Sequence, residues 1–138
     1  MPDDPDTPLT LFALAGGAAG VDAIVESFYA LVAADAPLRA VYPADLGPGK
    51  EKLKLYFEQW LGGEARYSAL YGHPRLRIRH FPFAIDDRAA GRWLRHMREA
   101  MQSNGVPVEA ERVIFEQLGP LARHMVNASS EARVPRPE

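Results

Sequence analysis

A stripe of apolar residues near the N-terminal end constrains the fold more than any other feature of the sequence. Between Val21 and Val32, apolar side chains recur at positions i, i+3, i+4, i+7, i+8 and i+11, which places them on one face of an α-helix. The members are Val21, Ile24, Val25, Phe28, Tyr29 and Val32. The stripe puts Tyr29 on the buried side, where its hydroxyl needs a hydrogen-bond partner. Tyr29 is therefore either a satisfied core residue or a donor directed into a pocket.

The segments around this helix are shorter or broken. Residues 9–14 fit a short apolar turn or helix, and the glycines that follow predict a sharp corner at which backbones approach closely. Asp35-Ala36-Pro37 ends the long helix, and residues 38–42 fit one further helical turn. The stretch 45–49 holds too many helix breakers for regular structure, and residues 64–73 are predicted to form a loop.

Three more amphipathic helices complete the pattern, with apolar stripes over residues 53–61, 90–101 and 113–126. The first of them stops at Gly62-Gly63, and the second begins at the capping carboxylates Asp86-Asp87. Gly119-Pro120 falls inside the third, where it predicts a kink or a break. Four main helices predict an all-α domain, and bundles of this kind often hold a cofactor between facing helices.

Length and composition point to one domain of a soluble protein. We expect a disordered acidic tail over residues 1–10, a single domain over 11–127 and a frayed tail over 128–138. The net charge of −2 argues against a general affinity for nucleic acid or an anionic membrane, and no apolar run approaches a membrane span. Without cysteine, disulfides and thiolate metal sites are excluded. The acidic, proline-rich start is unlike a signal peptide, so we expect a cytoplasmic protein.

The stretch from Gly72 to Phe83 carries most of the chemistry, with two histidines and three evenly spaced arginines between two prolines. Pro74 suits the first turn of a helix and Pro82 disfavours helix before it, so a helix here is short. Leu76 and His80 would share one face of that helix, which makes His80 a candidate metal or cofactor ligand. The alternating arginines also fit a half-exposed strand or a phosphate-binding patch. Spacing alone leaves these alternatives open.

Motifs spread along the chain resemble the truncated haemoglobins, and among them group II. The residues that carry the resemblance are Ala15-Gly16-Gly17, residues 24–29, Val41-Tyr42-Pro43, residues 57–63, Tyr67-Ser68, residues 72–83 and Trp93-Leu94. The run His-Pro-Arg-Leu-Arg-x-Arg-His-x-Pro-Phe at 73–83 is highly specific, and the match covers about residues 11 to 127. The resemblance implies a shortened globin fold, a two-over-two helical sandwich around haem b.

The resemblance also implies roles for residues on the proximal side and around the haem. His80 becomes the proximal iron ligand, which leaves the opposite coordination position open for a gas. Arg79 is expected near an anionic haem propionate, with Lys52 and Tyr67 as further candidates for that role. The remaining expected haem contacts are Leu76, Phe57 and Met97.

On the distal side, the family places hydrogen-bond donors at positions matching Tyr29, Tyr42 and Trp93. The distal-histidine position of ordinary globins aligns with Gly49, with Leu53 on the next helical turn. Gly49 has no donor and would leave a gap through which a ligand enters. The other histidines, at 73, 96 and 124, are expected to be packed, solvated or placed near a helix end.

Three functions follow from this resemblance and its alternatives. The first is a haem protein that binds dioxygen and other diatomic gases, with slow release because three donors hold the ligand. The second is a nitric-oxide dioxygenase or peroxidase that needs an external reductase, since no Gly-x-Gly-x-x-Gly nucleotide motif follows a strand. The third is a haem-free helical interaction module, for which His80→Ala would change nothing. A homodimer is compatible with the family, but the sequence shows no uncovered apolar helix face that would require one.

Overall fold

The computed structural model describes residues 10–72 and 85–126, and every regular element in these two ranges is helical. Its short helices are α1 (Leu11–Leu14), α3 (Ala36–Arg39) and α5 (Arg66–Tyr71). Its long helices are α2 (Gly17–Ala34), α4 (Gly47–Trp60), α7 (Asp87–Ser103) and α8 (Val108–His124). The predicted all-α class and the four main helices are confirmed.

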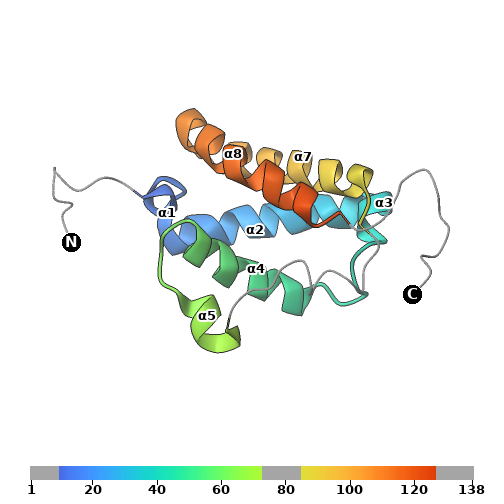
Figure 1. Ribbon diagram of the computed structural model, residues 1–138, viewed down its shortest axis with the longest axis horizontal. Helices are drawn as coiled ribbons and strands as arrows, with labels where there is room; N and C mark the ends of the chain where they lie inside the picture. The colour runs from blue at the N-terminus through green and yellow to red at the C-terminus, as the bar shows by residue number, and fades with distance from the viewer. Residues whose placement is uncertain (1–9, 73–84, 127–138) are drawn as a thin grey trace, which may run out of the picture.

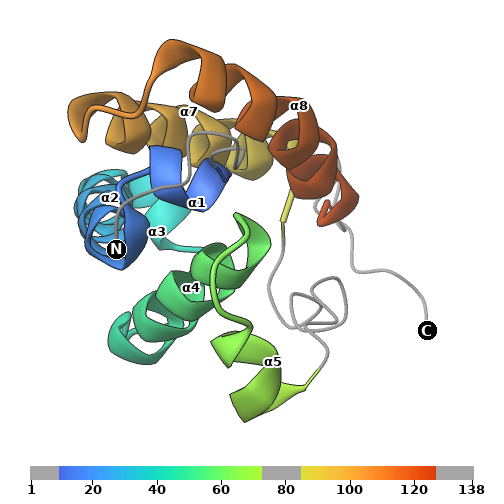
Figure 2. The same ribbon diagram turned by 90° about the vertical axis from the view of Figure 1, so that its left-hand side faces the viewer.

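The long helices form two pairs. Helix α2 packs against α4, α7 packs against α8, and α2 joins the pairs through its contact with α7. In Figure 1, α2 lies between α4 below and α7 above, and Figure 2 shows α7 and α8 together over α2 and α4. This arrangement is the two-over-two helical sandwich that the family resemblance implies.

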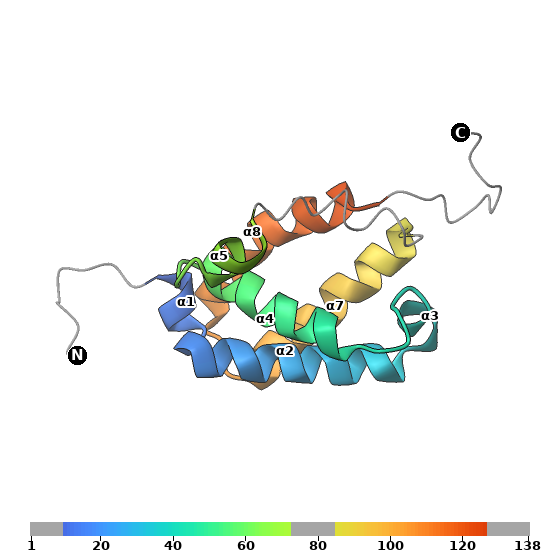
Figure 3. The ribbon, with the colours of Figure 1, turned by 90° about the horizontal axis from the view of Figure 1, so that it is seen from below.

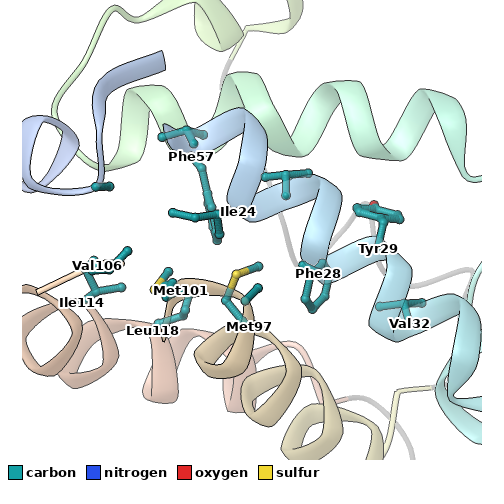
Figure 4. Packing of buried hydrophobic residues seen from close by; sticks show 14 of the residues in the cluster. Ile24, Phe28, Tyr29, Val32, Phe57, Met97, Met101, Val106, Ile114 and Leu118 are labelled. Atoms are coloured by element: carbon teal, nitrogen blue, oxygen red, sulfur yellow. The ribbon is translucent and has the colours of Figure 1, made fainter. Parts of the chain in front are cut away.

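The hydrophobic core lies where α2 meets α7 and α8 (Figure 4). All six members of the predicted stripe on α2 are buried, and Phe28 and Val32 are fully so. Met97 and Met101 of α7 face this stripe, and Ile114 and Leu118 of α8 close the core behind them. The helical spacing of the sequence therefore identified the buried face of α2 correctly.

The predicted helix ends are largely confirmed. Asp86 caps α7 by accepting a hydrogen bond from the Ala89 N–H at 2.8 Å, as the two carboxylates at its start predict. Gly62, directly after the C-cap residue Leu61 of α4, has a φ of 107°, a conformation that residues other than glycine rarely adopt. Gly20 lies in the first turn of α2, where a Cβ would be 2.0 Å from the carbonyl oxygen of Ala15, which precedes the helix. That position accepts only glycine, because the two backbone segments are almost in contact.

Several predicted boundaries were wrong. Helix α2 begins at Gly17 rather than Val21, and α3 occupies 36–39 rather than 38–42 because the Asp35 side chain caps it, with proline in its first turn. Helix α4 begins inside the stretch predicted to be irregular, where Asp45 Oδ1 accepts a hydrogen bond from the Gly47 N–H at 3.0 Å. Pro48 lies in the first turn of α4, where the missing N–H has no helical partner to lose.

Two further elements differ from the predictions. Residues 66–71 form α5 instead of a loop, and Figure 3 shows α5 beside the C-terminal end of α4. The side chain of Gln59 holds it there by bonding both the N–H and the hydroxyl of Ser68, at 2.9 and 2.8 Å. Helix α8 continues through Gly119 and Pro120, so of the kink or break predicted there, the break does not occur. One proline removes a single hydrogen bond, and packing of Leu118 in the core offsets that loss.

Of the described helices, α2 alone is long and apolar enough to span a membrane by length and composition, with a mean hydropathy of 1.4 over 18 residues. The expectation that no apolar run approaches this length is therefore wrong for α2. Core helices pass the same test, and the apolar face of α2 is packed against α4 and α7.

Candidate functional site

A cavity of about 530 Å³ opens between α4, α7 and α8. Its walls are mainly apolar and aromatic, and its volume is within the range of pockets that hold cofactors and small molecules. The cavity brings together eight of the twelve predicted site residues, which lie on five different segments of the chain. These are Tyr29, Tyr42, Gly49, Lys52, Leu53, Phe57, Tyr67 and Trp93.

Two tyrosines lie side by side on one wall of the cavity. Tyr29 projects from α2 and Tyr42 from the turn after α3, with ring centroids 5.8 Å apart in an edge-to-face arrangement. Burial raises the pKa of Tyr29 to about 12. Burial also raises the pKa of Tyr42 well above its usual range, and the neighbouring Tyr29 raises it further. Both phenols therefore remain protonated at neutral pH, so each can donate a hydrogen bond.

The third donor is the indole N–H of Trp93 on α7. The indole packs edge-on against Phe28 at 5.1 Å between centroids and against Phe57 at 6.5 Å. These two contacts hold the ring between α2 and α4. The Trp93 side chain interacts with the Tyr42 side chain and lowers the pKa of that phenol, which partly opposes the rise caused by burial. Tyr29, Tyr42 and Trp93 thus form one cluster of O–H and N–H donors in a mainly apolar cavity.

Gly49 lies against this donor cluster from the first turn of α4. A Cβ at this position would be 3.2 Å from the Tyr29 hydroxyl oxygen, closer than an ordinary van der Waals contact. Because Gly49 has no side chain, the space beside the Tyr29 hydroxyl stays open. Leu53, one turn further along α4, adds an apolar surface to the same wall.

The remaining predicted contacts are divided between the cavity and the core. Phe57 is buried on the α4 side of the cavity, and Tyr67 is buried on the α5 side. The Lys52 Nζ lies 5.1 Å from the centre of the Tyr71 ring, in a cation–π contact. Met97 is fully buried in the core between α2 and α7 and is not among the residues that line the cavity.

The predicted proximal residues Leu76, Arg79 and His80, and also His73, lie outside the residues that the structure describes. Two other histidines are described. His124 is exposed at the C-terminal end of α8, and His96 bonds Asp35 through Nε2 at 2.7 Å. Neither His96 nor His124 lines the cavity.

Several lining residues were not identified from the sequence as part of a site. Tyr56 and Ile85 contribute to the walls, and Leu118, Leu121 and Met125 close the cavity from the α8 side. Tyr56 lies three residues after Leu53 and one before Phe57, so helical spacing from those two predicted residues was a usable signal. Ile85 precedes its helix, and no periodic pattern includes it.

The residues present fit a haem group. A planar, largely apolar macrocycle needs an apolar cavity of this kind, and the aromatic rings of Phe57 and Tyr67 supply flat walls. Tyr29, Tyr42 and Trp93 supply neutral donors in this lining, and the Lys52 ammonium supplies a positive charge that suits an anionic substituent.

Comparisons with known proteins agree with this architecture. Residues 10–127 match the family model described as bacterial-like globin. The group 2 truncated hemoglobin of Bacillus subtilis is 40% identical over 104 residues, which are 75% of this chain and 79% of that protein. The crystal structure of the group II truncated hemoglobin from Bacillus anthracis superposes with a TM-score of 0.88 at 37% identity, covering 93% of this chain and 98% of that one.

A second solved structure supports the two-on-two arrangement. The group II 2-on-2 hemoglobin of Agrobacterium tumefaciens superposes with a TM-score of 0.85 at 34% identity, covering 91% of this chain and 99% of that one. The match to the family model extends over both helix pairs and the cavity between them. The chain belongs to the bacterial-like globin family and is a group II truncated haemoglobin, and thus a haem globin.

Proposed function

We propose that this globin binds haem b through His80 and holds dioxygen or another diatomic gas against Tyr29, Tyr42 and Trp93. One observation carries the proposal: three neutral hydrogen-bond donors converge on one wall of an apolar cavity. A haem held by His80 would supply the iron at which a gas binds. Arg79 and Lys52 are proposed to neutralise the propionates.

The protein residues determine how long the gas stays. A ligand that gains partial negative charge on binding is stabilised by donors already oriented toward it, because no reorganisation is then required. The edge-to-face contacts of Tyr29 with Phe28 and Tyr42 restrict its ring, and Phe28 and Phe57 restrict Trp93. Apolar walls also exclude water, which would compete for these donors. Slow release follows from this arrangement and suits ligand chemistry or sensing better than bulk transport; we propose the cytoplasm as its location.

The test is the absorption spectrum of the purified protein, ferric and then reduced under air, beside His80→Ala. We expect a Soret band and a stable oxygenated spectrum that the variant loses or strongly alters. His124→Ala is the matched control, because it removes an exposed imidazole from α8 and none from the cavity. Failure of the wild type to take up haemin would refute haem binding, and an unchanged His80→Ala spectrum would refute the ligand.

A further inference from the structure

Asp35, at the corner between α2 and α3, is a nearly buried carboxylate that no role described so far requires. Its side chain is 8% exposed. Oδ1 accepts hydrogen bonds from the Leu38 N–H at 3.4 Å and from Arg92 Nη1 at 2.9 Å. Oδ2 lies 2.7 Å from Nε2 of His96. Removing a carboxylate from water is costly unless charged partners compensate, and here both strong partners come from α7.

Capping α3 does not account for this arrangement. A helix cap needs one oxygen and one backbone N–H, and the capping bond is the longest of the three contacts. The two shorter contacts cross 57 and 61 residues of sequence to reach a different helix. They also hold the pKa of Asp35 below its ordinary value, with the His96 bond as the largest cause. The carboxylate is therefore a tie between the α2–α3 corner and α7.

His96 itself is placed by this tie. Its side chain is 13% exposed, and its second ring nitrogen, Nδ1, is buried without a hydrogen-bond partner among the described residues. An unpaired buried polar atom costs free energy, so the contact between His96 and Asp35 must offset the cost of burying Nδ1. His96 and Arg92 are one helical turn apart on α7, and Trp93 directly follows Arg92. The tie therefore reaches α7 on the turn that carries the indole donor.

The other end of the tie leads to Tyr42. Asp35 begins α3, and Arg39 at the end of α3 donates to the backbone carbonyls of Pro43 at 2.9 Å and Ala44 at 2.8 Å. Its Nη1 also lies 3.5 Å from the Tyr42 carbonyl. The turn that carries Tyr42 is thus held to α3, and α3 is held to α7 through Asp35. A displacement at this corner would change the separation of the Tyr42 hydroxyl and the Trp93 indole.

We propose that Asp35 is a positioning residue for two members of the donor cluster. By binding Arg92 and His96, it holds the Tyr42 hydroxyl beside the Trp93 indole N–H. The proposal rests on the proposed function only where a bound gas is used as the probe. It names Arg92, His96 and Arg39 as supporting residues that do not themselves line the cavity.

The first variant is Asp35→Asn, which keeps an oxygen to cap α3 and loses the charge that binds α7. Carbon monoxide on the reduced, haem-loaded protein is the probe, and its infrared C–O stretch reports hydrogen-bond donors near the ligand. We expect the stretch to move to higher frequency, and dioxygen release to become roughly two- to tenfold faster, as weakening of one hydrogen bond predicts. In the ¹⁵N spectrum of the same complex, the Trp93 indole N–H resonance should also move.

Glu111→Gln is the matched control. Glu111, on α8, is also a buried carboxylate bonded to α7: it accepts hydrogen bonds from Arg98 at 2.8 Å and from Gln102 at 3.2 Å. It does not line the cavity. A merely structural role for Asp35 predicts that both variants lose stability and that neither changes the C–O stretch. That result would overturn the proposal, as would equal shifts in both variants.

A second pair of variants keeps the proposal testable if Asp35→Asn does not fold. His96→Leu removes the donor to Asp35 and should shift the Trp93 indole resonance, whereas His96→Gln retains a donor and should resemble the wild type. If the wild type takes up no haemin, the proposed function fails, but the indole resonance of the haem-free chain still reports the tie. An unmoved resonance in both Asp35→Asn and His96→Leu would refute it in either state.

Discussion

Replacing Gly49 with alanine tests, by protein stability alone, whether Gly49 packs against Tyr29 of the donor cluster. Alanine in a helix is more favourable than glycine by roughly 0.5–1 kcal/mol, because glycine loses more backbone entropy on folding. Against this gain, the new methyl carbon would lie 3.2 Å from the Tyr29 hydroxyl oxygen, about 0.2 Å inside the 3.4 Å at which ordinary contacts begin. The Tyr29 ring cannot move aside freely, because Phe28 and Tyr42 pack edge-on against it at 5.5 and 5.8 Å.

We therefore expect Gly49→Ala to leave the free energy of unfolding nearly unchanged in the wild type. In a Tyr29→Phe background the hydroxyl is absent, so the same substitution should stabilise the protein by about 0.5–1 kcal/mol. The difference is a coupling energy that a double-mutant cycle measures. Urea unfolding of the four proteins, followed by circular dichroism in one fixed haem state, gives each value, since ligand binding shifts apparent stability.

Gly91→Ala is the control for helix propensity. Gly91 lies inside α7, and a Cβ there would meet nothing within 4 Å. It should stabilise both backgrounds by the same amount, about 1 kcal/mol. If Gly49→Ala also raised the free energy of unfolding equally in both backgrounds, the Tyr29 hydroxyl would not border Gly49. The described arrangement of the donor cluster would then be wrong.

Two further predictions concern the hydrophobic core and the stability of the protein at alkaline pH. Met97→Ala should destabilise the protein by about 2–5 kcal/mol in urea unfolding, because it leaves a cavity at a fully buried site. It should leave the Soret band unmoved, and a shifted band would show that Met97 contacts the haem. Since the pKa of Tyr29 is raised to about 12, the folded protein keeps a proton that the unfolded chain releases near pH 10, and stability should fall as pH rises between these values. Tyr29→Phe should remove about 2–3 kcal/mol of that fall, and an identical pH dependence in both proteins would contradict the burial of this phenol.

Local patterns in the sequence were sufficient for the parts of the fold that depend on local physics. The stripe on α2 follows from helical spacing, because a 3.6-residue period places those six side chains on one face. The capped start of α7 at Asp86 and the stop of α4 at Gly62 follow from unpaired helix-end groups and from the positive φ of glycine. These features require no knowledge of what the helix packs against.

The features that the sequence did not indicate share a dependence on tertiary contacts. Helix α5 is too short to be stable alone, and the amide side chain of Gln59, on another helix, holds Ser68 in it. Met97 belongs to the same periodic stripe as Trp93, yet one turn separates the cavity from the core. Periodicity identifies which face of α7 is buried, and only the placement of α2 decides what each turn of that face meets. The bond between Asp35 and His96 is equally invisible locally, since nothing near either residue indicates a partner 61 positions away.

The three donors differ in what holds them, and this difference explains where the structure needs a long-range tie. Tyr29 and Trp93 lie on long helices whose positions are set by core packing around Phe28, whose ring contacts both. Tyr42 lies outside any helix, in the turn between α3 and α4, so helical hydrogen bonds do not fix the backbone that carries it. A donor that must remain oriented from a turn requires backbone anchors, because unrestrained turns sample several conformations. The turn of Tyr42 is where Arg39 binds successive carbonyls and where Asp35 secures the adjoining helix.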